Sequence, residues 1–318
     1  MLARRCAFLA LAVLLGVMTA TPFDGAAARG RATKPAVAAA IVVDMNSGRV
    51  LHELRPDTPR YPASLTKMMT LYMLFSYLRA GAITPDSELV VTPHAASQAP
   101  TKLSLKPGAT IRTADAVNAL VTLSANDVAV TIAENLAGTE ANFARMMTEK
   151  ARALGMRATT FRNASGLPDD EQVTTARDMA VLAQHLIHDF PDYYGCFQTK
   201  YFSYHGRRYR NHNHLLFGYK GTDGIKTGYT RLAGFNLTAS VRRNDKHLVA
   251  VVLGGRTGAQ RDAAMRALLD QSFTRAVAGK PSPAPSIARL EMPALPPAPF
   301  AQPPARKRAF ALASADAM

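Results

Sequence analysis

The chain has 318 residues, 48% of them hydrophobic, with 38 Lys and Arg against 23 Asp and Glu. The net charge of +15 favours an anionic partner. The export that the N-terminal residues predict, described next, and the lack of a recognisable basic-aromatic nucleic-acid module argue against nucleic acid. A surface rich in carboxylates and phosphates fits the charge better.

The N-terminal residues have the layout of a secretory signal peptide. Arg4 and Arg5 precede an apolar run over residues 6–18, and small residues follow. This run is shorter than the about 20 residues that a membrane span needs. We therefore predict a signal peptide over residues 1–28, cleaved at its end or alternatively after Ala20, and a mature chain outside the cytoplasmic membrane. An uncleaved N-terminal anchor is the other interpretation.

The two cysteines predict no disulfide framework. Cys6 lies in the predicted signal peptide, so Cys196 has no partner within the mature chain. No motif around Cys196 supports a nucleophilic thiol. We interpret Cys196 as structural or incidental.

The first half of the mature chain begins with a predicted β-hairpin. Ala38–Met45 is apolar and β-branched, a turn signal follows at 46–48, and Arg49–Leu54 is the second strand. A helix is predicted over Ser64–Arg79, where large apolar residues recur on broadly one side. Four further helices are predicted in the middle of the chain, over Thr113–Leu123, Asp127–Ala137, Glu140–Leu154 and Thr175–His188.

The second half returns to strands. Phe235–Val241 and His247–Leu253 alternate and are rich in β-forming residues, and Gln260–Ala276 follows as a helix. Strands at both ends with helices between them predict one domain over residues 35–278. Its fold class is α+β, with an antiparallel sheet flanked by helices and an all-helical subregion.

Residues 279–318 differ in composition from the domain before them. Pro and Ala dominate and no apolar period appears, so we predict a disordered tail. A short membrane-surface helix around residues 305–313 is the alternative interpretation. Membrane attachment therefore stays open.

Three short motifs occur in order along the chain: Ser64-Leu65-Thr66-Lys67, Ser124-Ala125-Asn126 and Lys226-Thr227-Gly228. Ser and Lys three residues apart project from one helix face, with Cβ atoms about 5–6 Å apart. A neutral Lys can take the hydroxyl proton if burial or a neighbouring cation lowers its pKa. Either serine motif alone could instead be a helix cap. The ordered set predicts a serine nucleophile, two candidate proton carriers and an anion clamp.

The motifs lie within longer stretches that resemble the D-alanyl-D-alanine carboxypeptidases, the low-molecular-mass penicillin-binding proteins. The stretches are Tyr61–Thr70, Asn163–Pro168 with Thr174–Asp178, Asp223–Thr230 with Ala233–Leu237, and Gly254–Thr257. The resemblance implies the serine β-lactamase/transpeptidase-like fold and a periplasmic location. It also implies removal of the terminal D-alanine from peptidoglycan stem peptides, in the synthesis and remodelling of the cell wall.

The resemblance implies catalytic roles for four side chains. Ser64 is the nucleophile that forms an acyl-enzyme, and Lys67 is its base. The backbone N–H of Ser64, near a helix N-terminus, is placed for one half of an oxyanion hole. Ser124 relays the proton to the departing D-alanine nitrogen. Asn126 holds the substrate amide and Lys67.

Five further residues are expected to bind the substrate. Lys226 and Thr227 provide a cation and a hydroxyl for the D-alanine carboxylate. Gly228 lets its strand approach the substrate backbone closely. The backbone N–H of Tyr229 is the second oxyanion donor. Arg261 aligns with a family arginine that helps to bind the terminal carboxylate.

Three positions depart from the family pattern, since some members have His in place of Ser165 and Tyr229 and Arg in place of His212. His205, His212 and His214 form a histidine cluster, but no spacing motif supports a metal site there. No phosphate-binding glycine loop is present either. We therefore expect neither a metal nor a cofactor.

A β-lactamase is the closest alternative function, but that chemistry needs fast deacylation by a positioned carboxylate. The corresponding loop has Asp169, Asp170 and Glu171 without the Glu-x-x-Asn segment of class A enzymes. β-Lactam antibiotics are therefore expected as covalent inhibitors, with a long-lived adduct on Ser64. An endopeptidase acting on D-alanyl cross-links stays open, because it uses the same residues. A catalytically idle wall-binding protein is the alternative from another class.

Overall fold

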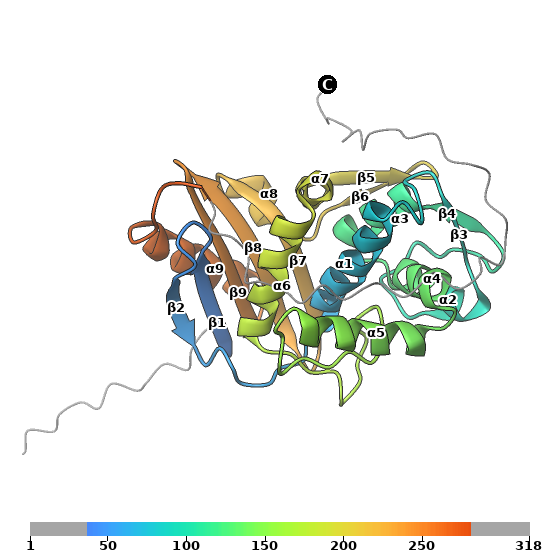
Figure 1. The fold of residues 1–318 in the computed structure, drawn as a ribbon, viewed down its shortest axis with the longest axis horizontal. Helices are drawn as coiled ribbons and strands as arrows, with labels where there is room; N and C mark the ends of the chain where they lie inside the picture. Colours follow the sequence, from blue (N-terminus) through green and yellow to red (C-terminus); the bar gives the residue numbers. More distant parts are fainter. Residues whose placement is uncertain (1–36, 281–318) are drawn as a thin grey trace, which may run out of the picture. The chain divides into compact units, whose positions relative to one another are not determined.

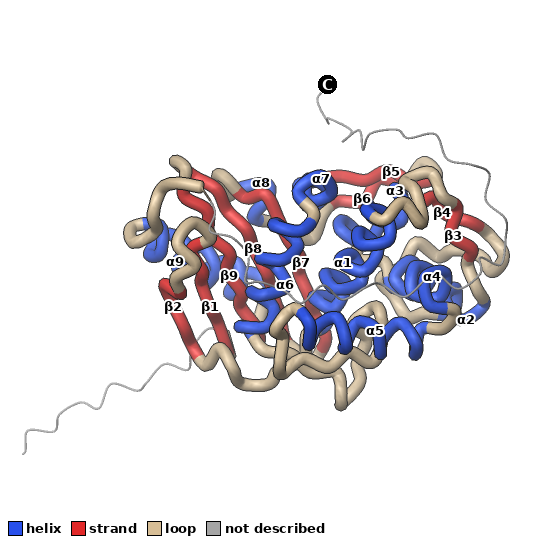
Figure 2. The backbone as a smooth tube through the Cα atoms, in the orientation of Figure 1, coloured by secondary structure: helices blue, strands red, loops and turns tan. Residues whose placement is uncertain are grey.

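Figure 1 shows a computed structural model of the chain, which describes residues 37–280. The predicted signal peptide and all but the first two residues of the predicted tail lie outside the described residues. Figure 2 separates the described part into helices and strands, with a five-stranded antiparallel sheet in the order β2-β1-β9-β8-β7. No helix within residues 37–280 is long and apolar enough to cross a membrane.

The predicted N-terminal hairpin is confirmed as strands β1 (Ala39–Asp44) and β2 (Val50–Leu54). The turn between them is held by Asp44, whose carboxylate accepts hydrogen bonds from the backbone N–H of Asn46 and the hydroxyl of Ser47. Every residue of β1 is buried, as expected of a strand covered on both faces.

The C-terminal strands complete the sheet. They are β7 (Thr222–Thr230), β8 (Gly234–Arg243) and β9 (Lys246–Gly255), and β9 pairs with β1. The prediction that distant parts of the chain share one antiparallel sheet is therefore confirmed. Strand β7, which carries the Lys226-Thr227-Gly228 motif, lies at one end of the strand order.

The long helices lie close to their predicted bounds. They are α1 (Thr66–Arg79), α3 (Thr113–Thr122), α4 (Asn126–Ala137), α5 (Glu140–Ala153), α6 (Ala176–Asp189) and α9 (Gly258–Phe273). The first predicted helix differs at its start, since Ala63–Leu65 forms a separate 3-10 turn, η1, before α1. Ser64 therefore lies one turn ahead of the regular helix.

Several short elements were not predicted. They are β3 (Glu88–Val90), α2 (Pro93–Ser97), β4 (Thr110–Arg112), α7 (Pro191–Tyr194), η2 (Gly195–Gln198), β5 (Tyr201–Tyr204), β6 (Arg207–Arg210) and α8 (Leu215–Gly218). These elements are too short for a helical or strand pattern of hydrophobic residues to repeat, so periodicity does not predict them.

The sheet separates two hydrophobic clusters. Ile41 and Val43 of β1 belong to the cluster that contains the buried residues of α1 and α6, whereas Ala40 and Val42 join Met265 of α9. Figure 1 shows α6 and α9 on opposite faces of the sheet. The alternation of β1 side chains therefore fixes the strand against helices on both sides.

Cys196 is fully buried in the larger cluster, and this burial raises the pKa of its thiol. A buried thiol with a raised pKa is a poor nucleophile. The environment agrees with a structural role for Cys196.

Candidate active site

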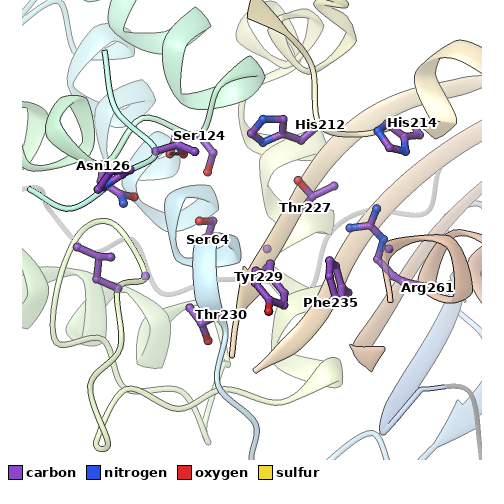
Figure 3. Close-up of a pocket in the computed structure, with 16 residues that line it drawn as sticks. Ser64, Ser124, Asn126, His212, His214, Thr227, Tyr229, Thr230, Phe235 and Arg261 are labelled. Carbon is purple, nitrogen blue, oxygen red and sulfur yellow. Dashed lines mark hydrogen bonds between the residues drawn. The ribbon is translucent and has the colours of Figure 1, made fainter. Parts of the chain in front are cut away.

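A cavity of about 470 Å³ lies between the helical region and strand β7, and Figure 3 shows the side chains that face it. Its lining combines residues from all three motifs: Ser64, Ser124, Asn126, Thr227 and Gly228, together with Tyr229 and Arg261. Lys67 and Lys226 lie behind this surface and are buried. The structure therefore brings all nine predicted site residues together around one cavity.

Ser64 is half-buried on the η1 turn. Its hydroxyl oxygen lies 3.2 Å from the amine nitrogen of Lys67. No side chain caps the start of η1 or of α1, so the interpretation of Ser64 as a helix cap is wrong. The hydroxyl is instead free to exchange a proton with the amine while facing the cavity.

Lys67 is fully buried and its amine contacts three oxygens. Besides Ser64, these are the side-chain oxygen of Asn126 at 2.7 Å and the backbone carbonyl of Ser165 at 2.5 Å. The Asn126 oxygen must face the lysine, because its amide nitrogen donates to the Ala99 carbonyl at 2.8 Å. A neutral amine has two N–H donors for these two acceptors and one lone pair left for the serine O–H.

Electrostatics favour the same neutral form. Burial is the largest cause that lowers the pKa of Lys67 well below its ordinary value of 10.5, and the positive charge of Lys226 lowers it further. Asp127 and Glu140 partly oppose this shift. Both causes named from the sequence, burial and a neighbouring cation, therefore act on the Lys67 pKa.

Ser124 lies in the break between α3 and α4 with a backbone φ of +64°. This left-handed conformation is costly for a residue with a side chain, of the order of 1–3 kcal/mol, and is common at functional sites. The hydroxyl oxygen is buried and has no hydrogen-bond partner among residues 37–280. No side chain caps α4 either, so the capping-turn interpretation of this motif is wrong.

A loop that the sequence did not highlight supports this wall. The backbone N–H of Asn126 donates to the Thr101 carbonyl at 2.7 Å. The buried carboxylate of Asp127 accepts from the backbone N–H groups of Leu103 and Leu105, both at 3.1 Å. These contacts fix the segment that carries Thr101 into the cavity lining. The signal that could have found it is Asp127, a carboxylate that directly follows the Ser124-Ala125-Asn126 motif.

A second loop holds the Ser165 carbonyl against the lysine. The side-chain oxygen of Asn163 accepts from the backbone N–H groups of Ser165 and Gly166, and Glu140 accepts from the Ala164 N–H at 2.9 Å. Gly166 has a φ of +84°, and a Cβ at this position would lie 1.9 Å from the Ala63 carbonyl oxygen. Only glycine fits against the serine turn here.

Gly228, on the strand side of the cavity, also lies where a side chain would crowd the η1 turn. A Cβ built on Gly228 would lie 3.0 Å from the Pro62 carbonyl oxygen and 3.1 Å from the Ser64 nitrogen. The absence of a side chain therefore lets β7 pass directly beside η1. Tyr229, the next residue, turns an exposed ring toward Phe235, with ring centroids 4.2 Å apart.

Lys226 and Arg261, the cations on the strand side of the cavity, are each fixed by hydrogen bonds to neighbouring protein groups. Lys226 is 2% exposed and its amine donates to the Thr227 carbonyl at 2.8 Å. Burial, followed by the charge of Arg261, lowers the pKa of Lys226 to about 7. Arg261 donates to Asp262 at 2.8 and 2.7 Å and lines the cavity on the side away from Ser124, as Figure 3 shows.

Two of the three predicted cluster histidines, His212 and His214, line the cavity, whereas His205 lies in the β5–β6 turn. Loss of surrounding water, followed by the charge of Lys226, lowers the pKa of His212 to about 4. His212 is therefore neutral near pH 7. His214 contacts Asp262 at 3.4 Å.

The cavity lining has no Asp or Glu side chain among its described residues. The acidic residues of the loop after the helical region, Asp169, Asp170 and Glu171, are outside that lining. No group of three metal-ligating His, Cys, Asp or Glu side chains gathers within residues 37–280. The chemistry that this site can perform is proton transfer to and from a serine hydroxyl beside a cationic wall.

The fold is that of the serine β-lactamase/transpeptidase-like penicillin-binding proteins, which confirms the predicted α+β class. The chain belongs to the D-alanyl-D-alanine carboxypeptidase family, peptidase S11, whose sequence pattern matches residues 27–257. The family predicted from the motifs is therefore confirmed.

Individual relatives agree with this assignment. D-alanyl-D-alanine carboxypeptidase DacA of Escherichia coli K12 is 37% identical over 240 residues, which cover 73% of this chain and 60% of the relative. Penicillin binding protein 5 of Haemophilus influenzae matches with a TM-score of 0.73 and 33% identity, over 76% of this chain and 72% of that one. The cefotaxime-bound Penicillin-Binding Protein D2 of Listeria monocytogenes matches with a TM-score of 0.69 and 30% identity, over 76% and 98%. The chain thus spans about 60% of the length of its E. coli relative.

Proposed function

We propose that the chain is a serine-type D-Ala-D-Ala carboxypeptidase that removes the terminal D-alanine from peptidoglycan pentapeptide stems. The observation that carries the proposal is the environment of Lys67. The Lys67 amine is fully buried and donates to two fixed carbonyl-type oxygens. In the neutral amine, the remaining lone pair is then directed toward the hydroxyl of Ser64. That arrangement is suited to a neutral general base beside a nucleophile.

In the acylation step, Ser64 attacks the carbonyl carbon of the penultimate D-alanine while its proton passes to Lys67. The backbone N–H groups of Ser64 and Tyr229 stabilise the oxyanion. The Ser124 hydroxyl, buried without a partner of its own in the described part, takes that proton from Lys67 and passes its own to the departing D-alanine nitrogen, which leaves Lys67 neutral again. Water then hydrolyses the acyl-enzyme: Lys67 takes a proton from the attacking water and returns it to the Ser64 oxygen as the acyl bond breaks.

The strand wall selects a substrate that ends in a free carboxylate. Thr227 and Arg261 face the cavity, and Lys226 adds positive charge from behind them. Gly228 keeps the strand close enough to the nucleophile for the substrate backbone to lie between both walls. A carboxylate in such a partly dry site forms charge-assisted hydrogen bonds.

β-Lactam antibiotics would acylate Ser64 by the same route and act as covalent inhibitors. Rapid release of the adduct needs a base that positions water, and the cavity lining has no carboxylate to do so among its described residues. We therefore infer a long-lived adduct rather than β-lactamase turnover. The β-lactam-bound relative supports binding of this class of compound.

The same proposal includes where the enzyme works and how its chain is divided. Residues 1–28 would be removed as a signal peptide, residues 35–278 would form the catalytic domain in the periplasm, and residues 279–318 would follow as a disordered tail.

The test is mass spectrometry of the purified chain with three substrates. Penicillin should add one stable acyl group to Ser64, and monomeric pentapeptide should release free D-alanine. Cross-linked dimer should stay intact; conversion of dimer to monomers without D-alanine release from pentapeptide would favour an endopeptidase. Rapid turnover of penicillin would contradict the proposal in favour of a β-lactamase.

A further inference from the structure

A basic segment lies outside the catalytic residues. Between Asp192 and Asp223 the chain has no carboxylate side chain, but it has five Lys and Arg residues: Lys200, Arg207, Arg208, Arg210 and Lys220. All five are exposed, and none forms an ion pair within residues 37–280. The segment therefore concentrates five exposed cations, none of which is neutralised by an ion pair within the described residues.

Aromatic rings hold two of these cations in place. The Arg208 guanidinium lies 3.9 Å from the ring centroid of Tyr201, and that of Arg210 lies 4.2 Å from Phe217. The two rings meet edge to face at 5.6 Å. Stacking orders a guanidinium through its face and leaves its N–H edge available for an anion.

The same segment borders a hollow of about 330 Å³ that shares no lining residue with the catalytic cavity. Lys200 and Lys220 line it, together with Phe217 and Tyr219. The Asp270 carboxylate, which accepts from the Tyr219 hydroxyl of this lining, is already engaged, since it also pairs with Arg243 at 3.6 Å. The hollow thus offers free cations around a concave surface.

The hollow and the catalytic cavity lie along one strand. The hollow reaches Thr222, where β7 begins, and the cavity includes Thr227 further along β7. At about 3.3 Å per residue, and with a register shift between Thr222 and Gly224, the two positions are at most roughly 17 Å apart. The linker 211–214 also leads from β6 to the cavity lining. A small anion fills one site, whereas a polymer with repeated anionic groups contacts both.

We propose that this surface, the basic hollow (Lys200, Tyr201, Arg208, Arg210, Phe217 and Lys220), is a non-catalytic binding site for neighbouring carboxylate-bearing stems of polymeric peptidoglycan. The proposal rests on the proposed function, since every stem that ends in D-alanine carries a free carboxylate. Two-site contact raises affinity for the polymer without changing the reaction at Ser64. The surface is concave and arginines cover its aromatic rings. It therefore suits a segment of the peptidoglycan polymer better than insertion into a bilayer.

The binding test uses the full chain with Ser64→Ala, so that no turnover occurs, and sedimentation with insoluble peptidoglycan. Adding Lys200→Glu, Arg208→Glu and Lys220→Glu should raise the apparent Kd about tenfold at low salt. The matched control adds Arg49→Glu, Lys106→Glu and Arg157→Glu, which change the net charge equally at exposed cations elsewhere. The control should bind within about twofold of the parent.

An equal loss in the control would overturn the proposal, because net charge alone would then explain binding. So would sedimentation with anionic phospholipid vesicles in place of peptidoglycan, since that would assign the surface to a lipid partner.

A second readout separates this inference from the proposed function. With Ser64 present, the triple variant should release D-alanine from soluble pentapeptide at the parent rate, and from insoluble peptidoglycan about fivefold more slowly. A parent rate on the soluble peptide also shows that the variant is folded. If the triple variant released D-alanine from both substrates at the parent rate, the proposed role of the basic hollow would be contradicted. Failure of the carboxypeptidase proposal would leave the sedimentation result unaffected.

Discussion

The helical and strand walls of the catalytic cavity prepare their side chains in different ways. On the helical wall, the Lys67 amine is enclosed by uncharged oxygens, including that of Asn126 at 2.7 Å. On the strand wall, Lys226 and Arg261 are cations backed by a carbonyl and by the Asp262 carboxylate. Burial without a counter-ion prepares one wall for proton transfer, and accumulated positive charge prepares the other to hold an anion.

The walls are also coupled, because the charge of Lys226 is one of the causes that lower the pKa of Lys67. A change of Lys226 should therefore affect both substrate binding and the base. A change confined to the Lys67 amine should affect only the chemical step. The predictions below use this difference.

The largest effect is expected from Lys67→Met on the helical wall. Methionine fills most of the buried volume but cannot take the Ser64 proton, so acylation by penicillin should slow about 10²–10⁴-fold, the usual contribution of a general base. Stopped-flow labelling measures this rate. Lys150→Met, at a half-buried lysine outside the cavity lining, is the control and should label normally. Labelling of the Lys67 variant at the parent rate would show that another group is the base.

Gly228→Ala tests how closely the two walls must approach. The added Cβ would lie 3.0–3.2 Å from backbone atoms of residues 62, 64 and 65, so one wall must move. A displacement near the nucleophile should lower kcat/KM about 10²-fold. Gly258→Ala is the matched control, because its Cβ meets only the Phe235 ring at 3.7 Å in the same cavity. Equal effects of both substitutions would argue against close packing at Gly228.

Arg261→Met should act mainly on substrate binding at the strand wall. Loss of a charge-assisted contact to the substrate carboxylate should raise KM for pentapeptide about 10- to 100-fold while kcat changes little. Steady-state D-alanine release separates the two constants. Arg256→Met, an exposed arginine that contacts Gln260, should leave both unchanged. A fall in kcat with constant KM would assign Arg261 to the chemical step instead.

The smallest effect is expected from pH above neutrality. The pKa of Lys226 is lowered to about 7, so its positive charge is present below that pH and is lost as pH rises through it. KM for pentapeptide should therefore increase severalfold between pH 6 and 8, by roughly the strength of one charge-assisted contact. A Lys226→Met variant should show no such rise. A KM that is flat in the parent chain would show that Lys226 does not contribute charge to binding.

Local sequence patterns predicted the helical wall well. Ser64 and Lys67 are three residues apart, so helix geometry alone brings them together. The partner from the second motif, Asn126, came from resemblance and order along the chain, since contacts between distant segments leave no local pattern. The hairpin and the long helices followed from periodicity for the same local reason.

The parts that were not predicted leave no recognisable pattern in the local sequence. The Ser165 carbonyl that contacts Lys67 is a backbone group, and backbone acceptors carry no residue-type signal. The strands β5 and β6 are too short to show a period, so the stacking of Arg208 on Tyr201 appears only in three dimensions. Asp262, which supports Arg261, is adjacent to it in sequence but has no motif of its own.

The most direct test of the account is the pH dependence of Ser64 acylation by penicillin, measured with the parent chain and with Lys67→Arg. A lowered Lys67 pKa predicts that the rate rises with pH and levels off well below the ordinary lysine value of 10.5. Arginine cannot lose its proton in a protein, so the variant should label at a small fraction of the parent rate at every pH. A parent rate that keeps rising to pH 10.5, or an arginine variant that labels normally, would contradict a neutral buried lysine as the base.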